Sequence, residues 1–124
     1  MLRKHLETIA AAEVARTLAA LPEPVREAAE GCSIELEWME QAAPLEAGLA
    51  EDLMGLFEGQ SYEGTEAASG VGDLPRIRLF LDNLWGYAGK DRSAFREEVR
   101  VTLLHELGHF LGLDEAQVED RGLA

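Results

Sequence analysis

The feature that most constrains the fold is a segment at residues 94–111 with the pattern of one long α-helix. From Val99 onward its apolar residues lie nearly all round the helix rather than along one stripe. Asp91 or Ser93 can cap the helix, because a side-chain oxygen there accepts an otherwise unpaired backbone N–H. A helix that is apolar on most sides has to be buried, so we expect the rest of the chain to pack around it.

Shorter helices are expected on either side of this segment. A first helix carries one apolar face and is ended by Pro22 and Pro24. A second, at residues 25–30, stops at Gly31, and a last short helix is predicted at residues 114–121. The apolar face of the first helix consists of Leu6, Ile9, Val14, Leu18 and Leu21.

Alternating apolar and polar residues predict strands at residues 33–39 and 76–82, and a weaker strand at 53–58 because it contains Gly55. With 124 residues, the chain fits a single domain spanning 1–124. We therefore expect a small α+β domain, with a sheet of two or three strands packed on the central helix and helices at both ends. The segments between these elements are expected to be a connection that can be partly helical at 41–52, an exposed loop at 60–73 and a turn at 85–89.

The charge of the chain is −13 and is unevenly distributed. Residues 27–75 include many carboxylates and no Lys or Arg, whereas Arg76 and Arg78 open a basic stretch. Glu35 and Glu37 can pair with these arginines across the sheet. The acidic balance argues against nucleic acid as a partner, because a phosphate backbone would be repelled.

No apolar run is long enough to span a bilayer, so no membrane partner is expected. The first residues have no apolar stretch of the kind found in a signal peptide. Cys32 is the single cysteine, which excludes an internal disulfide and suits a reducing compartment. These features predict a cytoplasmic protein.

Two histidines lie four residues apart inside the central helix, at His105 and His109. Residues at this spacing are about 40° apart and one turn apart, so both imidazoles can reach one metal ion. Glu106 lies about 100° round the helix, where it suits a water molecule better than the metal. The HExxH spacing is that of zinc metallopeptidase helices, in which the glutamate acts as a general base.

A third ligand is expected just beyond the helix. On a straight helix Glu115 would point away from the histidines, but Gly112 can adopt a left-handed conformation and turn the chain back. Asp114 is the alternative ligand, and either acid can instead orient a histidine. Two histidines and one carboxylate would leave a fourth position for water at a Zn²⁺ ion, which is the arrangement of catalytic sites.

Zinc would activate this water, and Glu106 would take its proton during attack on a peptide carbonyl. Tyr87, Tyr62, Arg78 and His5 are candidates for a donor that stabilises the oxyanion, and the sequence does not rank them. Two alternatives stay open. One is a non-catalytic metal-binding or protein-interaction module, and the other is a metal-free domain whose histidines pack in the core.

The segment His105-Glu-Leu-Gly-His-Phe-Leu-Gly-Leu-Asp-Glu115 resembles the zincin metallopeptidases, with an acid where metzincins have a third histidine. More narrowly, the chain resembles a small bacterial family of minimal zincin-like proteins. This resemblance implies metal binding by His105, His109 and Glu115, with Glu106 as the base. It also implies a substrate cleft beside an edge strand, for which residues 76–82 are the expected strand.

The chain departs from the larger zincins in one respect. Metzincins have a methionine turn below the metal, whereas the last methionine here, Met54, precedes the motif. A chain with no such turn would lack the lower wall of the substrate cleft and would bind substrate weakly. We therefore expect small or unfolded peptide substrates. A partner protein or a second copy of the chain is expected to complete the cleft.

Overall fold

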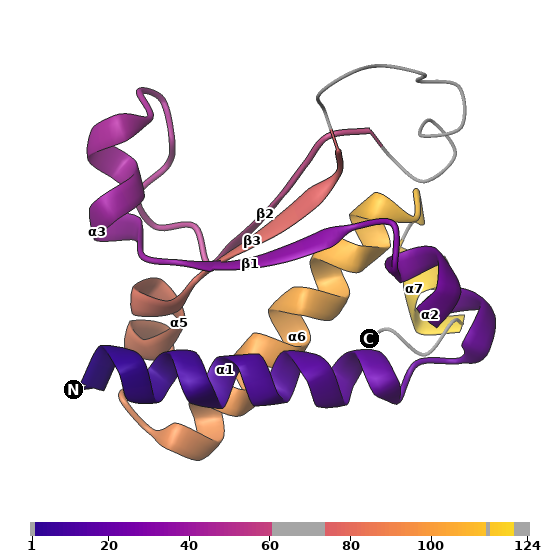
Figure 1. Cartoon of the computed structure of the whole chain (residues 1–124), viewed down its shortest axis with the longest axis horizontal. Helices are drawn as coiled ribbons and strands as arrows, with labels where there is room; N and C mark the ends of the chain where they lie inside the picture. Colours follow the sequence, from indigo (N-terminus) through magenta and orange to yellow (C-terminus); the bar gives the residue numbers. More distant parts are fainter. Residues whose placement is uncertain (1, 61–73, 114, 121–124) are drawn as a thin grey trace.

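The computed structural model describes residues 2–60, 74–113 and 115–120. Its centre is a three-stranded sheet with α1 and α6 against one face (Figure 1). This arrangement confirms the α+β class and the position of the long helix against the sheet. The helical segments are α1 (Leu2–Ala19), α2 (Glu23–Ala29), α3 (Met39–Ala42), the 3-10 turn η1 (Ala43–Leu45), α5 (Leu81–Tyr87), α6 (Arg92–Phe110) and α7 (Glu115–Asp120).

The three strands are β1 (Ser33–Glu37), β2 (Gly55–Glu58) and β3 (Arg76–Phe80), in the order β1-β3-β2. β3 pairs in parallel with β1 and antiparallel with β2. The strand expected at the edge is therefore the central one, and that prediction was wrong. β3 occupies the centre because its residues Ile77, Leu79 and Phe80 are fully buried, which requires cover on both sides. The edge strand next to α6 is β2.

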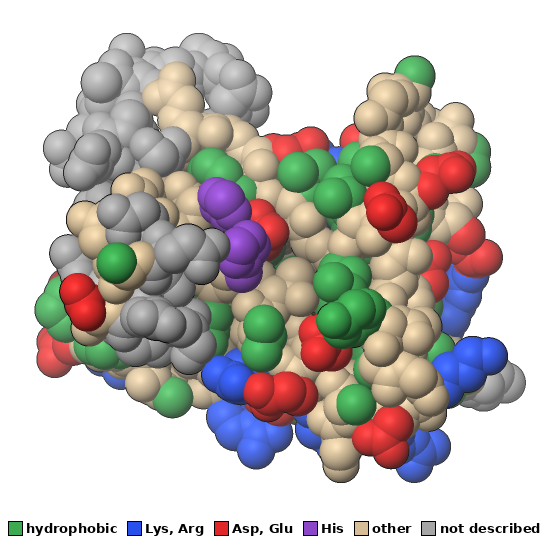
Figure 2. Space-filling view, turned by 180° about the vertical axis from the view of Figure 1, so that it is seen from behind, with side chains coloured by type: hydrophobic (Ala, Val, Ile, Leu, Met, Phe, Trp, Pro, Cys, Tyr) green, Lys and Arg blue, Asp and Glu red, His purple; other side chains and the backbone are tan. Residues whose placement is uncertain are grey.

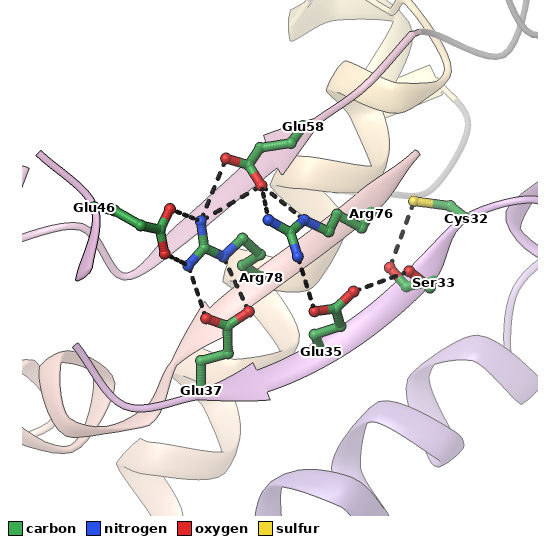
Figure 3. Close-up of polar contacts among 8 residues, drawn as sticks. All are labelled: Cys32, Ser33, Glu35, Glu37, Glu46, Glu58, Arg76 and Arg78. Atoms are coloured by element: carbon green, nitrogen blue, oxygen red, sulfur yellow. Dashed lines mark hydrogen bonds and ion pairs between the residues drawn. The ribbon is translucent and has the colours of Figure 1, made fainter. Parts of the chain in front are cut away.

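The two faces of the sheet have different chemistry. Ile77 and Leu79 belong to the core cluster that includes the buried side chains of α1 and α6. Arg76 and Arg78 alternate with them and therefore point to the opposite face, as Figure 3 shows. Arg76 pairs with Glu35, and the predicted pairing across the sheet is confirmed.

The side chain of Arg78 is only 2% exposed and lies among three carboxylates. It donates to Glu37 at 2.8 Å and contacts Glu46 and Glu58 (Figure 3). A buried guanidinium is stable only when its donors are satisfied, and here carboxylates satisfy them. The charge network therefore belongs to the sheet face that lies away from α6.

Of the segment expected as a turn at 85–89, residues 85–87 instead form the end of α5, so the prediction was wrong there, whereas residues 88 and 89 do form a turn. Leu81 and Leu84 of α5 are fully buried, and this burial stabilises a helix too short to form on its own. The strand before it ends at Phe80 rather than at residue 82. Asp82 instead accepts hydrogen bonds from the backbone N–H groups of Met39 and Glu40, at 2.8 and 3.1 Å, and so caps α3.

The long helix α6 begins two residues earlier than expected, with Asp91 as its cap. The carboxylate of Asp91 accepts the Ala94 N–H at 2.8 Å. The expectation that α6 is buried nearly all round was wrong, because one stripe of it stays exposed. This stripe consists of Glu97, Val101, His105 and His109.

Most other expected elements are confirmed with small shifts at their ends, including the helical part of the 41–52 connection. The loop expected at 60–73 lies outside the described residues apart from its first position. Among the helices that the structure describes, none combines the length and the apolar character that a membrane crossing requires.

Candidate metal centre

The two histidines of α6 lie together on the protein surface. Their Nε2 atoms are 3.1 Å apart, and their ring centroids are 4.8 Å apart at an interplanar angle of 78°. Both His105 and His109 are exposed, and Figure 2 shows two adjacent histidine side chains on this face. The alternative in which these histidines pack in the core is therefore wrong.

Glu106 lies beside the histidine pair and is held by the sheet. Its carboxylate accepts a hydrogen bond from the backbone N–H of Phe57 at 3.1 Å. Phe57 lies on the edge strand β2, whose other side pairs with β3. The possible ligand atoms of His105, Glu106 and His109 all lie within 4.8 Å of one another. The carboxylate is thus fixed next to the imidazoles by an element distant in the sequence.

This contact depends on a close approach of β2 to α6 at Gly55. A Cβ atom at Gly55 would lie 2.5 Å from Cγ2 of Thr102 and 3.3 Å from Cγ of Glu106. The first distance is well inside van der Waals contact, so no larger residue fits without movement. Phe57 adds a ring contact with Phe110 at 5.8 Å between centroids. The glycine that weakened the strand prediction is therefore what lets β2 reach Glu106.

Gly112 ends α6 as expected. Its φ angle is 72°, in the left-handed region, and no atom would obstruct a Cβ there. The N–H of Gly112 donates to the carbonyl of His109 at 3.1 Å, and the N–H of Leu113 donates to that of Gly108 at 2.9 Å. This pair of bonds is the Schellman motif, which closes a helix and redirects the chain.

The third metal ligand stays a prediction. Asp114 and the side chain of Glu115 lie outside the described residues. The backbone of Glu115 begins α7, three residues after the left-handed glycine. The turn that the ligand prediction needs is therefore present, whereas the position of the carboxylate is untested.

The donor set fits a zinc ion. Two imidazole nitrogens at a tetrahedral Zn²⁺, each about 2.0–2.1 Å from the metal, would be about 3.3 Å apart. The observed Nε2–Nε2 distance of 3.1 Å is close to this value. Neutral imidazole is also among the ligands that Zn²⁺ prefers. His105 and His109 can therefore hold one ion between them with little rearrangement.

An open groove of about 450 Å³ adjoins the histidine pair. It lies between α6, the segment that leads into β2, and Tyr87 at the end of α5. His105 and Glu106 are among the residues that line it. The groove is also lined by Asp52, Leu53, Met54, Gly55, Glu98, Val101 and Thr102. Figure 2 shows hydrophobic and acidic side chains around a hollow beside the histidines.

The four candidates for an oxyanion donor differ in their position relative to the groove. Tyr87 lines the groove together with His105. Arg78 lies on the far face of the sheet, where carboxylates occupy its donors, so it is not available. His5 lies on α1 and does not line the groove. Tyr62 lies outside the described residues.

Sequence reasoning missed the backbone of Phe57 and the side chain of Asn83. The Asn83 amide donates to the carbonyls of Glu51 and Leu53, at 2.8 and 2.7 Å, and so fixes one wall of the groove. No local pattern signals these contacts, because each joins segments about 30 or more residues apart. The spacing of Glu98, Val101 and His105 indicates only that they share one face of α6.

Comparison with known proteins agrees with this geometry. The profile of the family described as zincin-like metallopeptidase matches residues 30–123, which is most of the chain. The chain therefore belongs to the zincin-like metallopeptidase family. No curated protein sequence matches it.

Proposed function

We propose that the protein is a zinc-dependent peptidase that hydrolyses peptide bonds in small or unfolded substrates. The observation that carries the proposal is the position of Glu106. Its carboxylate lies beside two exposed imidazoles and is oriented by the backbone N–H of Phe57. A carboxylate oriented beside two candidate metal ligands can act as a general acid and base toward a reacting group.

In this proposal His105, His109 and Glu115 hold the ion, and Asp114 is the alternative for the third position. A bound Zn²⁺ supplies a Lewis acid that polarises a carbonyl and makes water a nucleophile near neutral pH. Glu106 accepts the proton of the attacking water and then delivers it to the leaving amine. Tyr87 is our candidate for the donor to the developing oxyanion, because it lines the same groove as His105.

The edge strand β2 gives the substrate a place to bind. The Met54 carbonyl accepts a hydrogen bond from the Phe80 N–H of β3. Hydrogen bonding to β3 alternates along β2, so the N–H and C=O groups of Gly55 and Phe57 point away from β3. An extended peptide can pair with such an edge, with main-chain hydrogen bonds supplying affinity. The N–H of Phe57 already donates to Glu106. The backbone of Gly55 is therefore the expected hydrogen-bonding partner of the substrate peptide.

The histidine pair is exposed, so one side of the cleft lacks a wall in the part of the chain that the structure describes. We propose that a partner protein or a second copy of the chain covers this side. We also propose the cytoplasm as its location, on the basis of the single cysteine.

The test compares the zinc-loaded protein with its Glu106→Gln variant in a peptide-library cleavage assay. Glutamine keeps the shape of the side chain but is not a base, so we expect cleavage to fall by at least about a hundredfold. Glu30→Gln is the matched control, because it removes the same charge at an exposed position on the C-cap of α2. Equal cleavage by Glu106→Gln and wild type would overturn the proposal.

A non-catalytic metal-binding module is the second candidate. The exposure of both histidines favours it, since an active site usually excludes water more completely. This candidate predicts that zinc raises the melting temperature while no peptide is cleaved. Elemental analysis of the purified protein, together with the cleavage assay, separates the two.

A further inference from the structure

We propose that the groove beside His105 binds a lysine or arginine side chain of the substrate peptide. The inference rests on the proposed peptidase function and deepens it by naming the substrate class. The groove adjoins Glu106 directly, so its occupant would be a side chain close to the bond that is cut.

The walls of the groove suit the apolar stem of a long side chain. Tyr87 is 67% exposed and Val101 is 44% exposed, and both are among the large hydrophobic residues that the fold leaves uncovered. Leu53 and Met54 complete the wall opposite α6. Apolar side chains left in contact with water beside a candidate active site indicate a surface that a ligand covers.

Two carboxylates give the groove its charge preference. Asp52 lies on the segment before β2, and Glu98 lies on α6. Among the described residues neither has an ion-pair or hydrogen-bond partner, whereas the carboxylates around Arg76 and Arg78 are paired with those arginines. A cationic group would neutralise these two charges, and an acidic side chain would be repelled.

The fold holds the backbone that carries each of these two carboxylates. Asn83 binds the carbonyls on either side of Asp52, those of Glu51 and Leu53. Glu98 lies in the middle of α6, about two turns before His105. Two turns correspond to about 10 Å along the helix axis. Lysine and arginine, which combine a long apolar stem with a charged end, can lie along Val101 with the charge directed at Glu98.

The test measures peptide binding to the full-length, zinc-loaded Glu106→Gln variant, so that bound peptide is not cut. The probes are three fluorescein-labelled peptides, Gly-Ala-X-Ala-Gly, with lysine, norleucine or glutamate at X. Norleucine keeps the apolar stem without the charge. We expect fluorescence anisotropy to give about fivefold tighter binding for lysine than for norleucine, and the weakest binding for glutamate.

The preference for lysine should disappear when Asp52→Asn and Glu98→Gln are combined. The matched control combines Glu27→Gln with Glu30→Gln, which also removes two negative charges, at exposed residues outside the groove. The control should keep the preference. Equal binding of lysine and norleucine peptides, an equal loss in both double variants, or no binding of any peptide would each overturn the inference.

Nuclear magnetic resonance locates the bound peptide independently of activity. The lysine peptide should shift the backbone amide signals of Val101 and Thr102. Shifts confined to other regions would contradict the inference. If the lysine peptide binds as expected but the zinc-loaded wild type cuts no peptide, the peptidase proposal fails and the charge preference of the groove stands.

Discussion

At the scale of single residues, small side chains decide how closely the elements approach. Gly55 lets β2 contact α6, and Glu106 can reach the Phe57 backbone only at that separation. Sequence reasoning treated Gly55 as a weakness in a strand, because glycine has low strand propensity. In the folded protein, however, the absence of a side chain at Gly55 is required for β2 to pack this closely against α6.

Replacing Gly55 by alanine should push β2 away from Thr102 and Glu106. We expect a loss of about 1–3 kcal/mol in the free energy of unfolding, as for other overpacked sites. Urea denaturation measures it. Gly86→Ala is the control, because a Cβ at Gly86 meets nothing within 4 Å and the residue lies in α5. That variant should be neutral or slightly more stable. A similar loss in both variants would contradict the role of Gly55.

Cys32 should be unreactive in the folded protein. Burial raises the pKa of its thiol to about 11, so almost no thiolate exists near pH 8. Labelling with a chromogenic disulfide at pH 8 should be at least about tenfold slower in buffer than in denaturant. Equal rates in the two conditions would show that the thiol is accessible.

At the scale of elements, α6 is defined at both ends by local chemistry that the sequence displays. Asp91 caps its start, and Gly112 ends it in a left-handed conformation. Both capping residues could be predicted from the sequence, because capping depends on residues within one turn of the helix end. α5 was missed because its buried face, formed by Leu81 and Leu84, depends on packing against distant elements.

Replacing Gly112 by alanine should strain the end of α6, since a β-carbon disfavours the left-handed conformation by about 1–2 kcal/mol. This strain would come from the backbone conformation and not from a steric clash, because no atom lies within 4 Å of a Cβ at Gly112. We expect weaker zinc binding and a lower melting temperature, measured by calorimetry with and without zinc. Gly112→Asn should lie between alanine and wild type, because asparagine tolerates this conformation better. Unchanged zinc affinity in Gly112→Ala would argue against a ligand beyond the turn.

At the scale of the whole molecule, the Arg78 network joins all three strands and the segment after η1. Its carboxylates come from Glu37 on β1, Glu58 on β2 and Glu46 after η1 (Figure 3). Hydrogen bonds from Arg78 lower the pKa of Glu46, and those bonds in turn raise the pKa of Arg78. The network links the strands to one another on the face of the sheet that lies away from the metal centre.

The protein should lose stability in acid partly through Glu46. Because its pKa is lower in the folded state than the ordinary value of 4.5, its contribution is complete above that value and disappears as the pH falls through the folded pKa. Thermal melts of wild type and Glu46→Gln should therefore differ more at pH 7 than at pH 3. A difference in melting temperature that is the same at both values would contradict this linkage.

The sequence by itself determined the long helix to within two residues of its ends, the histidine pair and the α+β class. These features depend on periodicity and on capping within a few residues, which a linear pattern records. Only the tertiary structure decided that β3 is central and β2 is the edge, and that Phe57 orients Glu106. It alone also brought Asp52, Tyr87 and Glu98 to one groove. Such contacts join residues far apart in the chain, and their geometry is fixed only when the core packs.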